Sequence, residues 1–442
     1  MADAANETVF AHWTRLVHAK PDALALVEAA SGRTWTRAAL DAEAHAWHAS
    51  LGEDISGNRV TFALPNGAAW FAVFIGLLRV GAVPVPIDPA EPAASQLQLA
   101  SSAGASWALI NGQLTPIPSN PIGYPKSGAC LVKLTSGSTG RPRALAFTDA
   151  QMLADGRQVC ASMRITADDI NFAVIPFGHS YGLGNLVMPL LAQGTAIVCA
   201  SVPLPQALAA DVARWNPTVF PAVPALLRAL TEADVTGSTL ASLRTVISAG
   251  MPLSPEIARA FAQKFNLRPH SFYGSSETGG ITYDRTGEAT LTGRSVGTPI
   301  EGVTLTPTRG GRFLVTSAAV QGRGSFSPSD RATFNEHGEL VLQGRAGRLV
   351  KIAGRRLDLG DLERALRTIP GVNDAFVALH PQNVDELAAV LATSIDAAAL
   401  RVLLRRELAA WKVPRRVVAV PEFPLTARGK TDTRALQALL VR

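Results

Sequence analysis

Apolar segments with the length of buried strands alternate with helical segments over the first 265 residues, and no other feature of the sequence constrains the fold as much. Such strands are expected at residues 23–28, 60–64, 83–87, 171–175, 196–199 and 245–248. Helices are expected at residues 36–51, 69–80, 149–163, 186–191 and 206–215, with further helices beginning at 224 and 255. This alternation is typical of a parallel sheet with helices on its faces, so the sequence predicts an α/β fold.

The pattern changes in the last third of the chain. Residues 293–330 read as short strands between Gly and Pro turns, which predicts a small antiparallel unit. Glycines cluster with Arg and Lys in residues 344–354, and residues 344–442 carry 17 Lys and Arg against 10 Asp and Glu. We therefore predict two domains, 1–343 and 344–442. Four prolines in residues 112–127 predict a connector without regular structure.

The net charge of +6 raises the question of a nucleic-acid partner. The excess positive charge lies in residues 344–442, where no aromatic residues are interleaved with the basic ones and no RNA- or DNA-binding motif occurs. We therefore expect no nucleic-acid partner. A basic surface facing phosphates or an acidic protein, and a merely solvated face, both remain open.

No membrane span or export signal is expected. The most apolar segment, residues 68–87, is interrupted by Arg79, Gly81, Pro84 and Pro86, and a span needs about 20 uninterrupted apolar residues. The first residues have neither a basic region nor an apolar core. Three scattered cysteines are too few for a disulfide framework, which favours a cytoplasmic location.

A candidate phosphate-binding loop follows the apolar residues 130–134. Residues 135–140 are all small or hydroxylated, and Arg141, Pro142 and Arg143 follow them. Glycines let backbone N–H groups approach an anion, hydroxyls add donors, and arginine adds a forked charge. The loop is not a Walker A motif, because Pro142 stands where that motif requires Gly before Lys. Taken alone, the same residues also fit an ordinary surface turn.

Six segments occur in the order 135–143, 248–254, 273–277, 295–299, 344–363 and 424–430. Together they resemble motifs of the adenylate-forming family, which includes acyl-CoA synthetases, aryl-CoA ligases, luciferase and the adenylation domains of peptide synthetases. The resemblance implies a large domain of helix-flanked sheets with a small β-barrel-like unit, and a small mobile α+β domain after it. It also implies activation of a carboxylic acid by ATP and Mg²⁺, followed by acyl transfer to CoA or to the phosphopantetheine of a carrier protein.

The resemblance also implies roles for single residues. Lys430, Glu277, Ser276 and His179 are the catalytic candidates, with Glu277 as the Mg²⁺ ligand and His179 on the carboxylate channel. The nucleotide would be bound by Thr135, Ser136, Gly137, Ser138, Thr139, Gly140, Arg143, Gly250, Met251, Pro252, Tyr273, Gly274, Asp330 and Arg345. Among these, Tyr273 would stack on adenine and Asp330 would accept hydrogen bonds from the ribose.

The sequence departs from the family pattern at several positions. Arg143 replaces the usual Lys, Ser276 replaces Thr, and Gly347 stands where the interdomain hinge is commonly Asp. Ser271 stands where an amide side chain often contacts adenine, and around Asp330 the motif keeps only the Asp and an aromatic residue. A nucleotide-binding regulatory protein without thioester transfer therefore remains an alternative.

Residues 178–181 indicate the substrate class. In this segment, peptide-synthetase domains that activate amino acids carry an Asp that binds the ammonium group. No acidic residue occurs there, so an aryl or fatty acid is expected, and an amino acid is disfavoured. A peptide-synthetase-like adenylation enzyme remains a further alternative. The sequence leaves open whether CoA or a carrier protein accepts the acyl group.

Overall fold

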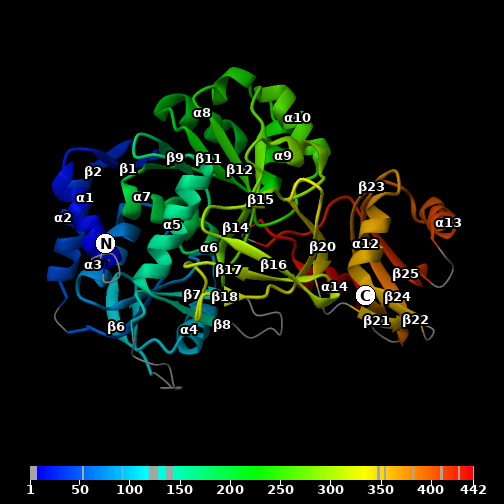
Figure 1. Cartoon of the computed structure of the whole chain (residues 1–442), viewed down its shortest axis with the longest axis horizontal. Helices are drawn as coiled ribbons and strands as arrows, with labels where there is room; N and C mark the ends of the chain where they lie inside the picture. The colour runs from blue at the N-terminus through cyan, green and yellow to red at the C-terminus, as the bar shows by residue number, and fades with distance from the viewer. Residues whose placement is uncertain are drawn as a thin grey trace. The chain divides into compact units, whose positions relative to one another are not determined.

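The computed structural model describes residues 7–51, 54–91, 93–118, 128–135, 143–345, 349–352, 355–380, 383–408, 412–426 and 429–441. The chain forms two compact units (Figure 1). Unit 1 comprises residues 1–306, 314–326 and 335–340, and unit 2 comprises residues 307–313, 327–334 and 341–442. The expected division into functional domains at residues 343 and 344 stays a prediction.

A nine-stranded sheet organises unit 1, in the order β15-β14-β13-β12-β11-β9-β10-β1-β2. The pairs from β13 through β1 are all parallel, whereas β2, β14 and β15 pair antiparallel. The α/β class predicted from the alternation of elements is thus confirmed. The strands are β1 Leu24–Glu28, β2 Arg33–Thr36, β9 Ile170–Ala173, β10 Ala196–Cys199, β11 Val219–Ala222, β12 Thr245–Ser248, β13 Pro269–Ser275, β14 Gly279–Tyr283 and β15 Thr298–Pro299.

Helices cover both faces of this sheet because both faces of its parallel strands are apolar. Successive residues of a strand point to opposite faces, and Leu26 accordingly packs in one core cluster while Val27 packs in the other. Helices α5 and α7 contribute to the first cluster, and α8, α9 and α10 to the second. The helices of unit 1 are α1 Val9–Ala19, α2 Arg37–Ala49, α3 Ala68–Arg79, α4 Ala93–Ser102, α5 Asp149–Met163, α6 Ser180–Gly182, α7 Met188–Gln193, α8 Pro205–Trp215, α9 Pro224–Glu232, α10 Pro255–Phe265 and α11 Glu288–Thr292.

Local signals in the sequence explain where several helices begin. Thr148 and Gln151 form a capping box at the start of α5, and the Ser254 side chain caps α10 while Pro255 occupies its first turn. The helix expected at residues 186–191 begins earlier than predicted. A short helix α6 leads into a π-helical turn, η2 Leu183–Val187, before α7, and hydrophobic periodicity gives no signal for a π turn.

Two smaller sheets complete the first part of unit 1. Strands β3 Arg59–Phe62, β4 Val83–Pro86, β5 Trp107–Ile110 and β6 Gln113–Pro116 pair in the order β4-β3-β5-β6. Strand β6 lies within the proline-rich segment 112–127, so the prediction of no regular element there is wrong for residues 113–116. Proline is tolerated because β6 is an edge strand and Pro116 is its last residue. Strands β7 Leu131–Thr135 and β8 Arg143–Phe147 form a separate antiparallel hairpin.

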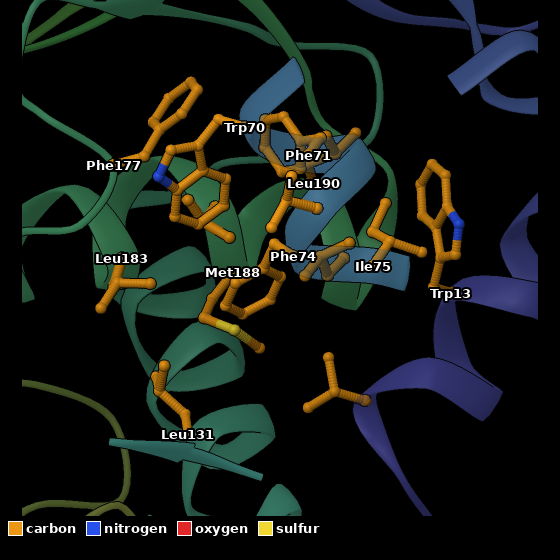
Figure 2. Packing of buried hydrophobic residues seen from close by; sticks show 14 of the residues in the cluster. Trp13, Trp70, Phe71, Phe74, Ile75, Leu131, Phe177, Leu183, Met188 and Leu190 are labelled. Carbon is orange, nitrogen blue, oxygen red and sulfur yellow. The ribbon is translucent and has the colours of Figure 1, made fainter. Parts of the chain in front are cut away.

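An aromatic cluster joins α3 to the segment that follows β9. Trp70 and Phe71 of α3 lie 5.3 and 5.1 Å from Phe177, measured between ring centroids (Figure 2). All three side chains are buried. Such aromatic pairs stabilise by about 1 kcal/mol each beyond the area they bury. The residues just after Phe177 are therefore held by a rigid core.

Short elements follow in the later part of the chain. They are the 3₁₀ turns η3 Gly237–Leu240 and η4 Arg309–Gly311, and strands β16 Thr304–Thr308, β17 Arg312–Thr316, β18 Ser325–Phe326, β19 Asp330–Phe334 and β20 Leu340–Arg345. Strands β16, β17 and β18 form one sheet, and β19 pairs with β20. The small antiparallel strands expected after residue 293 are thus present.

Unit 2 is an α+β unit built on a three-stranded sheet, β23-β24-β25, with a separate hairpin β21-β22. Besides β19 and most of β20, its elements are β21 Leu349–Ile352, β22 Arg355–Asp358, α12 Leu359–Arg367, β23 Val372–His380, β24 Asn383–Thr393, α13 Ala397–Glu407, β25 Arg416–Val420 and α14 Thr433–Val441. Helix α13 ends before the predicted residue 410. Residues 409–410 lie outside the described part of the chain.

Two observations concern the membrane span, the disulfides and the location discussed from the sequence. Among the described residues, no helix is long and apolar enough to cross a membrane. Cys130, Cys160 and Cys199 are buried free thiols. The cytoplasmic location stays a prediction.

The ion pair between Asp169 and Arg244 generates a testable pH dependence. Burial alone would raise the pKa of Asp169, but hydrogen bonds from Arg244, Thr166 and Thr218 outweigh it and lower this pKa to about 2. Its stabilisation is therefore complete above the unfolded-state pKa near 4 and is lost as pH falls through about 2. Arg244→Met should lower the free energy of unfolding in urea by about 2 kcal/mol at pH 7, and by about half as much at pH 3. An equal loss at both pH values would contradict this account.

Candidate active site

The carboxyl ends of four parallel strands lie along one edge of the main sheet. Ala222, Ser248 and Ser271 are aligned in register across β11, β12 and β13, and β9 is the next strand beyond β11. The segments that leave these strands are those that the sequence singled out around His179, Gly250 and Ser276. Ligands of open parallel sheets bind outside the carboxyl ends of the strands. This edge is therefore the candidate site.

The segment after β9 turns sharply and is fixed by an asparagine from another loop. The Asn66 side chain donates to the carbonyl of Ile175 and accepts from the N–H of Phe177, both at 2.8 Å. His179 then occupies the N-cap position of α6. Asn66 stands in a Pro-Asn-Gly sequence that predicts only a turn, so sequence reasoning missed its contact with residues about 110 positions away.

Tyr181 anchors the same turn to the ends of two strands. Its hydroxyl donates to the carbonyls of Ala222 and Ile247 at 3.4 and 3.3 Å. Burial raises the pKa of Tyr181 well above its usual value, which keeps the hydroxyl protonated as a donor. Gly182 is required here because a Cβ atom would lie 2.1 Å from the carbonyl oxygen of Pro176. The π turn η2 follows, a feature frequent at functional sites.

Ser276 and Glu277 lie on the tight connection between β13 and β14. The Ser276 hydroxyl accepts a hydrogen bond of 2.9 Å from the Ser180 hydroxyl, which links this connection to the His179 turn. Gly274 allows the close approach, since a Cβ atom there would lie 2.5 Å from the carbonyl oxygen of Gly279. The backbone carbonyl of Glu277 accepts from the N–H of Gln321 at 2.8 Å.

Arg143 lies beside Glu277. Thr135 and Arg143 are paired in register at the end of the β7–β8 hairpin where residues 136–142 connect the two strands, and Arg143 Nη1 is 4.0 Å from Glu277 Oε1. The Glu277 side chain is 18% exposed and the Arg143 side chain 62% exposed, so the carboxylate is mostly buried whereas the guanidinium is largely in solvent. Ser136, Gly137, Ser138, Thr139 and Gly140, which were predicted to bind phosphate, lie outside the described residues.

The predicted adenine-side residues lie at the same edge of the sheet. Tyr273 is half-buried on β13, and Gly250 begins the turn after β12 with a φ of 85°, a conformation that favours glycine. Met251 is half-buried and Pro252 exposed. The Ser271 hydroxyl, in place of an amide side chain, accepts from Thr290 at 3.0 Å.

The remaining predicted residues belong to unit 2, whereas those described above belong to unit 1. Asp330 is half-buried at the start of β19, and Arg345 ends β20. Lys430 lies in a turn in which its carbonyl accepts from the N–H of Thr426 at 2.7 Å and its own N–H donates to the Thr426 hydroxyl at 3.3 Å. Their roles stay predictions.

The residues at Glu277 fit Mg²⁺ only if phosphate oxygens and waters supply most of its ligands. Among the described residues, no group of three or more His, Cys, Asp or Glu side chains could hold a metal ion. Mg²⁺ prefers oxygen ligands and often takes one carboxylate together with phosphate oxygens and waters. Glu277 supplies the one carboxylate that this mode requires.

Comparisons with known proteins show which family and which fold the chain matches. The family described as AMP-binding enzyme matches residues 13–121 and 118–306, and the AMP-binding enzyme C-terminal domain matches residues 361–430. Klebsiella oxytoca NpsA in complex with 3-hydroxyanthranilyl-AMSN has the same fold, with a TM-score of 0.82 at 21% identity over 99% of this chain and 100% of NpsA.

Curated relatives differ in length. The salicyl-AMP ligase / salicyl-S-ArCP synthetase of Mycobacterium tuberculosis is 27% identical, over 86% of this chain and 80% of that protein. A linear gramicidin synthase of Brevibacillus parabrevis is 27% identical over 96% of this chain. The chain spans about 6% of the length of that synthase and of a second peptide synthetase that it matches.

The hydrogen bonds between the Asn66 side chain and the backbone of Ile175 and Phe177 can be tested by substitution. Asn66→Ala leaves a buried N–H group and a buried carbonyl without partners, so the free energy of unfolding in urea should fall by about 2 kcal/mol. If the His179 turn lines the carboxylate channel, the KM for the acid should rise more than the KM for ATP. Asn58→Ala, in another turn of the same unit, is the matched control. A loss of stability without any change in the KM for the acid would mean that the turn does not contact the acid.

Proposed function

Because the chain belongs to the AMP-binding enzyme family, we propose that it joins a carboxylic acid to the α-phosphate of ATP and then passes the acyl group to a thiol. The first step forms an acyl-adenylate and releases pyrophosphate. The observation that carries this proposal is the convergence of Arg143 on Glu277 beside the Ser180–Ser276 hydrogen bond. A cation, a carboxylate and two serine hydroxyls thus lie together at the carboxyl edge of the sheet.

The chemical step requires stabilisation of negative charge. When the carboxylate oxygen attacks the α-phosphate, charge builds on the phosphate oxygens, and fixed donors and cations stabilise that charge. Ser276 is held by Ser180 and would present its own hydroxyl to the α-phosphate. Arg143, at the end of the β7–β8 hairpin, would hold the β- and γ-phosphates together with Thr135 and the residues between them.

Glu277 would bind Mg²⁺ and share it with the phosphate oxygens. The metal would neutralise charge on the leaving pyrophosphate. Arg143 at 4.0 Å is near enough to attract the Glu277 carboxylate, but this distance is long for a hydrogen bond. Arg143 can turn toward phosphate because its side chain is largely exposed.

We propose an aryl or fatty acid as the substrate. The segment between Phe177 and Tyr181 carries no acidic residue that would hold an ammonium group, and the adjoining Trp70, Phe71 and Phe177 are buried apolar residues. The relatives named for salicyl and 3-hydroxyanthranilyl groups support an aromatic acid. His179 would line the channel by which the carboxylate enters.

The thiol acceptor would be CoA or the phosphopantetheine of a carrier protein. Residues 344–442 are basic, which suits both the phosphates of CoA and an acidic carrier protein. The relative named as a salicyl-S-ArCP synthetase supports a carrier protein. Lys430 would bridge the carboxylate and the α-phosphate in the first step, while Asp330 and Arg345 would bind the ribose and Tyr273 the adenine.

Acid-dependent exchange of labelled pyrophosphate into ATP tests the first half-reaction. With a panel of aryl and fatty acids, the wild-type protein should catalyse exchange with at least one acid. Glu277→Gln keeps the shape of the side chain but loses the metal ligand, so exchange should fall by about 100-fold. Glu301→Gln, which changes a carboxylate elsewhere in unit 1, should exchange like the wild type.

The enzymatic proposal would be contradicted if no acid in the panel supports pyrophosphate exchange and if Lys430→Ala has no effect on exchange. That result would leave the nucleotide-binding regulatory protein as the better interpretation. Exchange followed by thioester formation with only one of CoA and a phosphopantetheinylated carrier protein would identify the acceptor.

Thr135 provides a separate test because its role is limited to the first half-reaction. Thr135→Ala should reduce pyrophosphate exchange by about tenfold, since one donor to the phosphates is lost. Thiol transfer from a supplied acyl-adenylate should change little, because that substrate carries no β- or γ-phosphate. Equal losses in both half-reactions would show that the hairpin is not the pyrophosphate-binding element.

A further inference from the structure

A buried carboxylate outside the predicted site residues lies against the backbone of two site loops. Asp155, on α5, is 3% exposed, and its Oδ1 accepts a hydrogen bond of 3.1 Å from the N–H of Gly280. A Cβ atom on Gly279 would lie 2.2 Å from the same oxygen, and one on Gly184 would lie 3.1 Å from Oδ2. Only glycine therefore lets the segment after Glu277 pass this close to the carboxylate. Gly184 belongs to the π turn η2, so this turn, which follows His179, also lies close to Asp155.

A register shift in the pairing of β13 with β14 lies next to Gly280. The pairing of β13 with β14 shifts register between Tyr273 and Gly274, so that Gly274 faces Gly280. A bulge interrupts the hydrogen-bond ladder and redirects the chain. Since Gly280 is buried, its N–H group would be costly to leave without a partner. Asp155 supplies that partner, and Gly280 is three residues after Glu277 in the chain.

Lys133 supplies the opposite charge from the strand that leads into the phosphate loop. It lies on β7 two residues before Thr135, so the two side chains share a face of the strand. Lys133 is 2% exposed, and its Nζ lies 4.2 Å from the centre of the Phe147 ring. Burial lowers the pKa of Lys133 and raises that of Asp155, and each charge opposes the shift of the other.

We propose that Asp155 is a positioning residue, which fixes the Glu277 loop against β7 and the His179 turn so that the Glu277 carboxylate faces the metal. This inference rests on the proposed function, because it assigns Glu277 to Mg²⁺. The carboxylate contacts Gly280 directly, packs on Gly184, and attracts Lys133 electrostatically. Displacement of Asp155 would thus move three segments of the site at once.

The charge of Asp155 matters in addition to its shape. An apolar side chain would leave the N–H of Gly280 without an acceptor and would leave Lys133 as a buried cation without a counter-charge. Asn keeps an acceptor oxygen but removes the charge. A comparison of Asp155→Asn with Asp155→Ala therefore separates the hydrogen bond from the electrostatic attraction to Lys133.

The test measures ATP binding by calorimetry on the full chain, with Mg²⁺ and with EDTA. In Asp155→Ala the advantage of Mg²⁺, given by the ratio of the two Kd values, should fall by about tenfold, as it does when residues that orient a metal ligand are lost. Asp155→Asn should show a smaller fall. Asp169→Asn is the matched control, because Asp169 is another buried, ion-paired carboxylate of unit 1 and should leave the ratio unchanged while lowering Tm.

Amide hydrogen exchange provides a second readout that needs no nucleotide. Exchange in peptides covering residues 275–283 should be about tenfold faster in Asp155→Ala than in the wild type, and unchanged in Asp169→Asn. If the Asp155 variants keep both the wild-type Mg²⁺ ratio and the wild-type exchange, or merely lose stability as Asp169→Asn does, the inference is overturned. A wild-type protein that binds no ATP would overturn the proposed function instead, and the exchange data would still decide whether Asp155 holds the loop.

Discussion

The parallel pairing of β9, β11, β12 and β13 is the constraint on which the rest of the site depends. Because parallel strands run in one direction, the segments that leave them emerge at one edge of the sheet. Residues far apart in the chain, such as His179 after β9 and Ser276 after β13, therefore contribute to one region. Tyr181 shows this most directly, since its hydroxyl contacts the ends of two of these strands.

Backbone geometry and a few hydroxyl groups shape the site more than charged side chains do. Gly182 and Gly274 allow chain segments to approach closer than any Cβ atom would permit, and Ser180 joins two loops through Ser276. Few charged side chains take part. Arg143 and Glu277 are partly exposed, whereas Lys133 and Asp155 are buried. Two buried opposite charges contribute little net stability, but they penalise arrangements in which one charge moves away from the other.

Much of this architecture follows from the sequence, because periodicity and capping are local. The starts of α5 and α10 could be predicted from Thr148 with Gln151 and from Ser254 with Pro255, and the motif at Ser276 and Glu277 predicted a functional loop. Asn66, Lys133 and Asp155 could not be found this way. Asn66 reads as a turn residue, and Lys133 interrupts an apolar run without any sign of its partner. Their roles depend on contacts with residues far away in the chain, which no local pattern encodes.

The central claim is that the carboxylate of the acid attacks the α-phosphate of ATP at this edge of the sheet. It can be tested by supplying an acid labelled with ¹⁸O in its carboxylate, together with ATP, Mg²⁺ and a thiol acceptor, and by analysing the phosphorus products by mass spectrometry. The account predicts that one ¹⁸O atom from the acid appears in AMP and none in pyrophosphate. Label in orthophosphate, or turnover of ATP without label in AMP, would contradict it.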